Sequence, residues 1–439
     1  MLIQYSVKNY KCFKEEAQLS MVASNYDRDT LWEQNVIPIP KFNLNLLRSA
    51  VIYGANASGK SKILEALSFM RSFILSSSKD KQMNELIETQ PFRLNPNTKK
   101  EPSFFEMNFI LDNELYRYGF EVTAQSVVSE WLFHRPHTKE VELFMRDHQV
   151  FEVHRTFKKA KFLVENKMVR NNALLLSVAA QFNDQIAEKI MDWIRSLNIF
   201  MGLQEHRYTG FSIGWLNEQE TKKDILQFMK GADWNIEDLK PVKMSLDSLP
   251  NQLPAALKTF ISQKIKDGDN ELFSDVSVMH KQYDDHKNWV DMESFSLDDD
   301  ESSGTKKYFA FSAPLLATLQ KGKMAVIDEL DAKLHPNLTA QMIAAFHSKL
   351  TNPLNAQLLF NTHDTHLLNE GLFRRDQIWF TEKDRYGAAT LFSLDRFRDD
   401  EGNKPRLGED YERNYIRGKY GAVPYLGPFN SFFTKTERP

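Results

Sequence analysis

The sequence of 439 residues contains almost no cysteine. Cys12 is its one cysteine, which excludes a disulfide framework and a multi-cysteine metal site. Charge of one sign is not in excess either, because the formal net charge is only −3. A balance of this kind provides no global attraction to nucleic acid or to an acidic membrane. A DNA-binding surface would therefore have to be a local patch.

Long hydrophobic runs are also missing. No segment is apolar over enough residues to span a bilayer, and the first residues alternate between polar and apolar, unlike a signal peptide. Hydrophobic residues nevertheless make up 42% of the chain and charged residues 26%, which is typical of a globular protein with a real core. We expect a soluble, reduced, cytoplasmic protein without a membrane partner, folded as one large interrupted domain or two lobes.

The spacing of the apolar residues predicts an α/β fold. Residues 1–13 alternate like a short strand pair, and the apolar run 49–53 before Gly54 is typical of a buried central strand. A helix is expected to follow to about Ser76. Over residues 103–135 the period changes to two, which indicates an antiparallel β layer. Helical spacing then returns over residues 174–200.

The second half of the chain mixes both periods. Short helices are expected around residues 222–229 and 255–265, and a strand pair around 276–282 and 289–297. An acidic run at 298–301 follows. The spacing then predicts a helix at 306–319, a strand at 324–327, a helix at 337–350 and a strand at 357–361. No internal repeat or low-complexity tract interrupts this order.

The strongest motif lies between the strand at 49–53 and the helix that follows it. Residues 54–61 match G-x-x-x-x-G-K-[ST] at every fixed position, and this context is typical of a phosphate-binding loop. Backbone N–H groups and the helix N-terminus surround the phosphates, while Lys60 reaches the β- and γ-phosphates and the Ser61 hydroxyl ligates Mg²⁺. The nucleotide-binding residues predicted here are Gly54, Asn56, Ala57, Ser58, Gly59, Lys60, Ser61 and Lys62.

Two later strands end in side chains suited to phosphoryl transfer. The strand at 324–327 is followed by Asp328, which can bind Mg²⁺, and by Glu329, which is placed to orient or deprotonate the attacking water. An apolar strand that ends in Asp-Glu is common in itself, and the phosphate loop upstream is what favours the catalytic interpretation. The strand at 357–361 leads to His363, whose imidazole is expected to sense the γ-phosphate and help to hold the water.

A short Ser-Ser-Gly-Thr segment, residues 302–305, stands just before the helix at 306–319. Small hydroxyl residues and a glycine at a helix start can bind phosphate, or can simply cap the helix. By itself the cap is the better interpretation. In chain order, however, Ser303 and Gly304 occupy the place of an ABC signature loop.

Together these motifs resemble the ATPase heads of the SMC, RecF and OLD class of ABC-type proteins. Residues 8–13 (Lys-Asn-Tyr-Lys-Cys-Phe) resemble the opening strand motif of that class, and residues 327–329 its Walker B strand with a catalytic glutamate. Residues 330–331 and 334–336 resemble its D-loop, and His363 its switch histidine. The S-x-G-T form of 302–305, and segments 376–380, 382–384 and 418–424, are similar to RloA-like ATP-binding proteins of bacterial phage defence.

The resemblance implies an ABC-type ATPase head with a mixed central sheet, an antiparallel β layer and a mainly helical insertion. It divides the chain into an N-terminal ATPase part at 1–182, the insertion at 183–291 and a C-terminal ATPase part at 292–439. It also implies a homodimer or higher homo-oligomer in which Ser303 and Gly304 act in trans on ATP-Mg²⁺ bound by the other copy. Gln181 is the candidate for the glutamine that ligates the metal, with Gln90 as the alternative.

The resemblance leaves three functions open. The first is an ATP-driven switch or sensor in antiphage defence, which responds to DNA or a phage-derived trigger and controls a nuclease encoded nearby. Only about 75 residues follow His363, too few for the Toprim nuclease of OLD proteins. The second is a RecF- or SMC-like DNA-repair ATPase, and the third a transporter subunit, which the β layer and the opening motif disfavour. A GTPase is rejected because residues 381–384 lack the N/T-K-x-D order.

Other polar clusters carry less weight. His134 with His137, and His280 with His286, lack the partners of a metal site and are expected to be solvated. The basic stretch at 158–170 is expected to be a solvated face rather than a phosphate-binding one.

Overall fold

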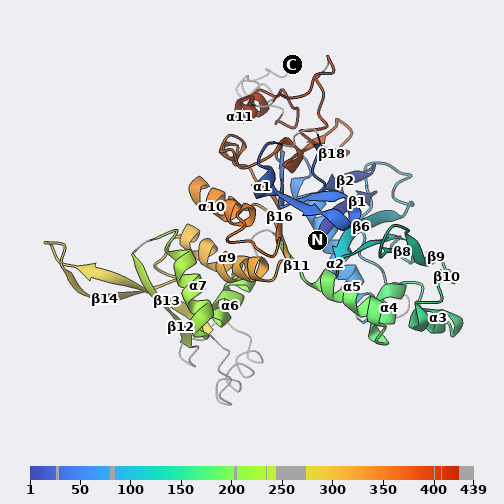
Figure 1. Cartoon of the computed structure of the whole chain (residues 1–439), viewed down its shortest axis with the longest axis horizontal. Coiled ribbons are helices and arrows are strands. Elements are labelled where there is room, and N and C mark those ends of the chain that lie inside the picture. Colours follow the sequence, from blue (N-terminus) through green and yellow to red (C-terminus); the bar gives the residue numbers. More distant parts are fainter. Residues whose placement is uncertain are drawn as a thin grey trace, which may run out of the picture. The chain divides into compact units, whose positions relative to one another are not determined.

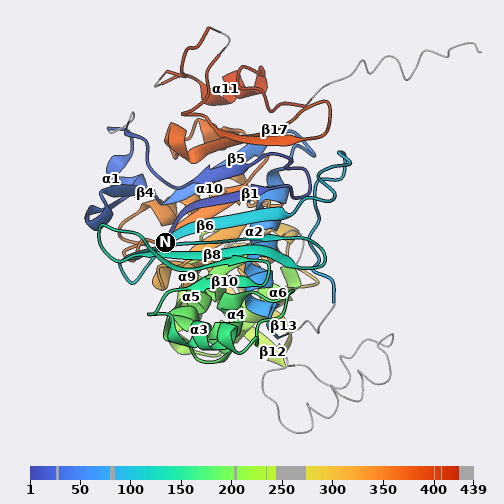
Figure 2. The same cartoon turned by 90° about the vertical axis from the view of Figure 1, so that its right-hand side faces the viewer.

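A computed structural model describes residues 1–25, 29–79, 85–201, 205–233, 235–243, 273–399, 401–406 and 408–424. The chain forms two compact units (Figures 1 and 2). Unit 1 comprises Met1–Ile199, Val326–Asp328 and Gln357–Pro439, and unit 2 comprises Phe200–Ala325 and Glu329–Ala356. The fold is α/β, as predicted.

A seven-stranded antiparallel sheet is the β layer of unit 1. Its strand order is β10-β9-β8-β7-β6-β1-β2. Burial along β6 alternates, as the period of two predicts. β1 pairs with β2, which lies beyond the 1–13 segment, and also with β6. The strands are β1 (Leu2–Lys8), β2 (Ala17–Ser20), β6 (Ser103–Leu111), β7 (Glu114–Val122), β8 (Val127–Arg135), β9 (Val141–Asp147) and β10 (Val150–Val153).

A six-stranded mixed sheet has the order β11-β15-β16-β5-β17-β18. β5 is buried along its whole length and pairs in parallel with β16 and β17, while β18 is antiparallel to β17. The strands are β5 (Ser49–Gly54), β11 (Leu197–Phe200), β15 (Met324–Ile327), β16 (Gln357–Asn361), β17 (Ile378–Lys383) and β18 (Ala389–Ser393). β3 (Val36–Ile39) and β4 (Leu44–Leu47) form a separate antiparallel pair.

Helix α2 (Lys60–Ser76) packs against the β layer through aromatic rings. Phe73 meets Phe120 with ring centroids 5.5 Å apart, and Phe69 meets Phe105 at 5.1 Å. The other helices of unit 1 are α1 (Trp32–Asn35), α3 (Lys158–Glu165), α4 (Leu175–Gln181), α5 (Gln185–Arg195), α11 (Tyr411–Ile416) and the 3₁₀ turns η2 (Pro40–Phe42), η3 (His366–Leu368) and η4 (Arg375–Gln377).

The helical spacing over residues 174–200 covers three elements rather than one. α4 ends at Gln181, and Asp184 caps a new helix, α5, by accepting from the backbone N–H groups of Ile186 and Ala187. The last four residues, Leu197–Phe200, form β11 at the edge of the mixed sheet. A local cap and a sheet edge therefore override the apolar periodicity at these two points.

Unit 2 combines helices with a three-stranded antiparallel sheet of order β12-β13-β14. The strand pair expected at 276–297 is confirmed, whereas the helix expected at 255–265 lies outside the described residues. The segment 183–291 thus contains strands as well as helices. In the part of unit 2 that the structure describes, the elements are α6 (Glu205–Trp215), α7 (Gln219–Met229), β12 (Ile236–Lys243), β13 (Phe273–Tyr283), β14 (Trp289–Ser296), α9 (Ser303–Gln320) and α10 (Pro336–His347). Among the described helices, none has the length and apolar content needed to cross a membrane.

Candidate nucleotide-binding site

The phosphate loop is an exposed curve held at both ends by buried residues. β5 leads into Gly54, and α2 begins directly after Gly59. Asn56 and Ala57 are exposed on the outside of the curve, and Ala57 adopts the left-handed conformation with φ 62°. Because the start of α2 leaves its first N–H groups without intrahelical acceptors, this geometry suits an anion.

Lys60 is folded over the loop from which it projects. Its side chain is 6% exposed, and Nζ donates to the carbonyl oxygens of Gly54 at 2.8 Å and Ala55 at 3.1 Å. The ammonium is therefore fixed at the start of the loop. Ser61 and Lys62 follow on the partly exposed side of α2.

Gly54 is required at its position because its neighbours leave no room for a side chain. A Cβ there would lie 2.5 Å from Ser58 Oγ and 2.5 Å from the Thr381 carbonyl oxygen. The hydroxyls of Ser58 and Thr381 are hydrogen-bonded at 2.6 Å. Thr381 was not predicted from the sequence, since only the parallel register of β17 on β5 brings it opposite Gly54.

The opening motif supports the other end of the loop. A Cβ at Gly59 would lie 3.1 Å from Cys12 Sγ, and burial raises the pKa of that thiol. Lys11 forms an ion pair with Glu65 of α2, and its backbone N–H donates to the Gln90 carbonyl at 2.7 Å. Gln90, the alternative glutamine, is thus tied to the segment that packs on the loop.

Glu65 receives two ammonium groups beside the loop. Burial would raise the pKa of its carboxyl, but hydrogen bonds from Lys11 and Lys62 lower it overall. Lys62 donates to Glu65 at 2.7 Å. Lys62 and Lys11 of the opening motif therefore share one carboxylate on α2. The predicted contact between Lys62 and the nucleotide stays a prediction.

Asp328 lies at the carboxyl end of β15, next to the strand that carries the histidine segment. Asn361 Nδ2 donates to Asp328 Oδ1 at 2.5 Å, which fixes the orientation of the carboxylate. Asn361 in turn pairs with Ile52 of β5. Unit 1 thereby brings Asp328 to the same sheet edge as the phosphate loop. Asn361 was not singled out in the sequence, although its place two residues before His363 was the available signal.

The segment that contains His363 follows this edge. Thr362 N–H donates to the Ile52 carbonyl at 3.3 Å, and the Tyr53 hydroxyl donates to the Asp364 carbonyl at 3.1 Å. His363 itself is exposed. Both neighbours of the histidine are thus bonded to β5, so its backbone is held at the level where β5 turns into the phosphate loop.

Helix α11 packs on this side of unit 1. Tyr415 packs on Tyr53 and Phe380, with ring centroids 5.8 and 5.2 Å apart. Burial raises the pKa of Tyr415 to about 12, and a hydrogen bond with the Gly54 backbone acts in the opposite direction. Glu412 accepts from Thr365 at 3.0 Å. The segment 418–424, which carried part of the resemblance, folds back onto β17 where Ala422 N–H meets Glu382.

Glu329 has an unusual backbone conformation for a residue with a side chain. Its φ is 55°, which is costly outside glycine and is often found at functional sites. Within unit 2, buried Lys307 of α9 donates to the Glu329 carbonyl at 2.7 Å. Lys307, which the sequence analysis did not single out, thus helps to hold the backbone at the predicted catalytic glutamate.

The signature-like segment begins α9. Ser302 is the N-cap, and its Oγ accepts from the Thr305 N–H at 3.1 Å, so the capping interpretation is confirmed for Ser302. Ser303 is exposed in the first turn. A Cβ at Gly304 would lie 2.8 Å from the Lys333 carbonyl oxygen, so the D-loop-like segment of unit 2 packs directly on this glycine.

Gln181 lies at the opposite end of α2 from the loop. It lines a cavity of about 440 Å³ together with Lys79, Ser177 and Arg195. Lys79 follows the C-terminal end of α2, a helix of 17 residues that is about 25 Å long at ~1.5 Å per residue. The structure does not bring Gln181 to the loop, and its role as a metal ligand stays a prediction.

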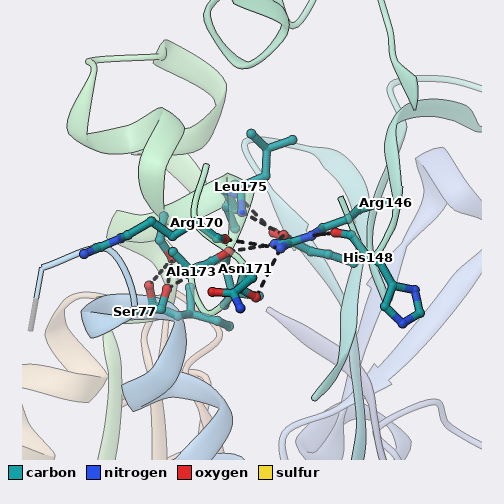
Figure 3. A network of polar contacts seen from close by, with 12 residues as sticks. Ser77, Arg146, His148, Arg170, Asn171, Ala173 and Leu175 are labelled. Atoms are coloured by element: carbon teal, nitrogen blue, oxygen red, sulfur yellow. Dashed lines mark hydrogen bonds and ion pairs between the residues drawn. The ribbon is translucent and has the colours of Figure 1, made fainter. Parts of the chain in front are cut away.

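A buried polar network holds that end of α2 (Figure 3). Ser77 Oγ accepts from the Leu174 N–H at 3.3 Å, and Arg146 of β9 donates to the Ala173 carbonyl at 2.6 Å. Glu130 of β8 accepts from the Leu175 N–H at 2.7 Å and lies 3.5 Å from Arg146. The helix that begins at the phosphate loop is thus anchored to the β layer.

Two of the four discounted histidines lie in strands and contact carboxylates: His134 of β8 contacts Glu114 at 2.8 Å, and His280 of β13 contacts Glu301 at 2.9 Å. The expectation that they are solvated was wrong for these two, whose side chains are mostly buried. Within the part of the chain that the structure describes, no group of three or more His, Cys, Asp or Glu side chains could hold a metal ion. Ser61 and Asp328 still fit Mg²⁺, because this ion commonly takes one or two protein oxygens and completes its shell with phosphate and water.

Comparison with known proteins places the chain in a family. Residues 49–199 and 208–369 match the family described as "AAA domain, putative AbiEii toxin, Type IV TA system". The match covers more than half of the chain, and the protein belongs to this family of ATPase-type AAA domains. It is similar to the SMC head domain from Thermotoga maritima, with a TM-score of 0.41 and 11% identity over 89% of this chain and 98% of that chain. No curated protein is a significant match.

Proposed function

We propose that this protein is an ATP-hydrolysing molecular switch of the ABC type in bacterial antiphage defence. ATP-dependent dimerisation would control a separate effector, with a nuclease encoded nearby as the expected class. The observation that carries the proposal is the shared edge of β5, β15 and β16. There the phosphate loop, the Asp328–Asn361 pair and the His363 segment come together.

The residues of this edge suit the chemistry of phosphoryl transfer. Ser61 and Asp328 would hold Mg²⁺, which neutralises charge on the β- and γ-phosphates when bound. Lys60 would move from the carbonyls of its own loop to the phosphates, a short displacement because its ammonium already lies at the loop. Glu329 would hold or deprotonate the attacking water, and His363 would meet the γ-phosphate.

The link to defence rests on family membership. Its description names a putative toxin of a type IV toxin–antitoxin system. The S-x-G-T segment and residues 418–424 add the resemblance to defence ATPases. The trigger, either DNA or a phage-derived molecule, belongs to the same proposal.

Glu329→Gln tests the hydrolytic part. The variant should bind ATP with unchanged affinity and turn it over about 100-fold or more slowly, because removal of a general base typically costs this much. Steady-state phosphate release and equilibrium nucleotide binding give the two readouts. Glu370→Gln, which neutralises an exposed glutamate of unit 1, is the matched control. If Glu329→Gln hydrolysed ATP at the wild-type rate, Glu329 would not be the residue that activates the water.

A RecF- or SMC-like role on DNA is the alternative. It is favoured by the exposure of Lys158, Lys161 and Lys167 on and beside α3, although Lys159 of the same stretch is engaged with the carbonyls of Phe182 and Asn183. DNA binding that is strengthened by ATP and weakened steeply by salt would support this role. If DNA did not alter ATP turnover and turnover did not depend on salt, the ATP-driven switch would be favoured over a role on DNA.

A further inference from the structure

The end of β13, strand β14 and the acidic run that follows them form one strongly acidic segment. Residues 280–301 contain eight carboxylates and two lysines, a formal charge of −6, whereas the whole chain has −3. The eight are Asp284, Asp285, Asp291, Glu293, Asp298, Asp299, Asp300 and Glu301. A local field of this size attracts cationic partners and repels nucleic acid.

The hairpin formed by β13 and β14 exposes large apolar side chains. Trp289 is 61% exposed, Val290 58%, Tyr283 45% and Phe295 38%. Nearly all of β14 is exposed, and Figure 1 shows it running out beyond α7. Within the described residues, β14 is an edge strand with a neighbour on one side only. An exposed edge with aromatic side chains is a template for an added strand.

A cavity of about 420 Å³ opens on one face of this hairpin. Phe295 forms one wall, and the His280 ring meets it edge-on at 5.1 Å with an angle of 89°. His280 Nε2 is 2.9 Å from Glu301 Oε1. The cavity is also lined by Asn235, Glu293 and Asp300, and by Lys281, whose ammonium is paired with Glu237 at 2.7 Å.

The lining defines the chemistry of an occupant. Asn235 Oδ1 is buried and has no hydrogen-bond partner in the part of the chain described, so it is an acceptor without a donor. Glu293, Asp300 and Glu301 add carboxylate oxygens, and Phe295 adds an aromatic face. An arginine guanidinium presents its donors in a planar fork and stacks on aromatic rings, so it can donate to several of these oxygens while it lies on the Phe295 ring. A lysine ammonium also donates hydrogen bonds and is attracted to an aromatic face, but it has neither a plane that stacks nor a fork that pairs with a carboxylate.

We propose that the β13–β14 hairpin is a docking surface for a basic, extended segment of a partner protein. The segment pairs with the free edge of β14, and one of its arginine side chains enters the cavity at Asn235, Glu293 and Phe295. The aromatic side chains Tyr283 and Trp289 cover the remaining apolar groups of the segment. This surface lies outside the predicted nucleotide-binding residues, and the proposal does not depend on ATP hydrolysis.

Glu301 connects this surface to the start of α9. It lines the cavity and directly precedes Ser302, the N-cap of that helix. An occupant that contacts Glu301 therefore touches the residue next to the signature-like segment.

The test uses the full chain and a fluorescent peptide of alternating arginine and threonine, an extended basic probe, followed by anisotropy. Glu293→Lys and Phe295→Ala should each weaken binding about tenfold, because the first removes a charge-assisted contact and the second an aromatic contact. Glu165→Lys, which reverses an exposed glutamate of α3, is the matched control and should bind like the wild type. ATP turnover, measured in parallel, should stay unchanged in all three variants.

Several outcomes would overturn the proposal. If Glu165→Lys lost as much affinity for the peptide as Glu293→Lys, the net charge of the chain alone would explain the loss. If the wild type bound an alternating lysine–threonine peptide with equal affinity, recognition of a guanidinium in the cavity would be excluded. Self-association of the chain that is lost in Glu293→Lys would make a second copy the occupant. If Glu293→Lys and Phe295→Ala both bound the peptide with wild-type affinity, the hairpin would not be its docking surface.

Discussion

At the scale of single residues, the structure adds Asn361 to the predicted metal site. Its amide holds Asp328, one of the predicted Mg²⁺ ligands, through a hydrogen bond of 2.5 Å. Residues that orient a ligand in this way typically affect metal affinity by a factor of about 10–100. Asn361 is thus a positioning residue, one step removed from the phosphates.

Asn361→Ala should therefore raise the Mg²⁺ concentration needed for half-maximal ATP turnover by about tenfold, while turnover at saturating Mg²⁺ changes less. A titration of hydrolysis against Mg²⁺ measures both quantities. Asn369→Ala, which removes an exposed asparagine bonded to Asp410, serves as the control. An unchanged Mg²⁺ dependence in Asn361→Ala would show that Asn361 does not position a metal ligand.

Gly54→Ala tests the packing of the phosphate loop. The new Cβ would lie 2.5 Å from Ser58 Oγ and the Thr381 carbonyl oxygen, so the loop must shift, at a cost of about 1–3 kcal/mol in the free energy of unfolding. Gly210→Ala in α6 adds the same atom where no heavy atom lies within 4 Å and should be neutral or slightly stabilising. Chemical denaturation of both variants checks the difference.

The site residues that could be predicted from the sequence are those that belong to contiguous motifs. The phosphate loop and the Asp328–Glu329 pair are each read from a few adjacent letters and their flanking strands. Thr381, Asn361 and Lys307 were missed because each reaches its partner through strand register or packing across a long stretch of chain, which no local pattern encodes. Gln181 was placed by the class resemblance alone, and it lies at the other end of α2.

At the scale of elements, the joint between α2 and the β layer depends on the buried pair Glu130 and Arg146. Both side chains have no exposed surface. Burial raises the pKa of the Glu130 carboxyl, while Arg146 and the N–H groups that it caps act against this rise. The two buried charges therefore compensate each other, and loss of either partner leaves the other charge buried without compensation.

Arg146→Met should destabilise the fold by about 3–5 kcal/mol at neutral pH, and by less in acid. Without Arg146 the pKa of Glu130 in the folded state rises further above its ordinary value of 4.5, so the folded chain binds a proton more tightly than the unfolded one. Stability then increases as pH falls through the interval between the raised pKa and the ordinary one. Thermal unfolding at several pH values measures this dependence.

Arg117→Met provides the comparison, since Arg117 pairs with Glu140 in a partly exposed position where such pairs contribute about 0–1 kcal/mol. Equal destabilisation by Arg117→Met and Arg146→Met would contradict the account, as would a loss in Arg146→Met that does not change with pH.

Elements with a clean period were predicted well. Burial along β6 alternates for most of its length, as its apolar residues do, whereas β7 and β8 each have three consecutive buried residues. β5 is buried throughout. Errors arose where one element ends and another begins within a few residues, as α4 ends at Gln181 and Asp184 caps the start of α5. The pairing of β1 with β6, more than 90 residues away, also lay beyond any local signal.

At the scale of the whole molecule, the predicted catalytic residues are divided between the two units. Lys60, Asp328 and His363 belong to unit 1, whereas Glu329 and the signature-like Ser303 and Gly304 belong to unit 2. The proposal that Ser303 and Gly304 act on ATP held by another copy of the chain is therefore the central claim about assembly.

A mixing experiment tests this claim most directly. Lys60→Ala should lose ATP binding and Ser303→Arg should block closure over ATP, so each variant alone should be inactive. A dimer of one Lys60→Ala chain and one Ser303→Arg chain contains one intact composite site if the signature acts in trans. An equimolar mixture should then recover about a quarter of wild-type ATP turnover, because half of the dimers are mixed and each has one working site. No recovery in mixtures shown to exchange subunits would contradict the composite site.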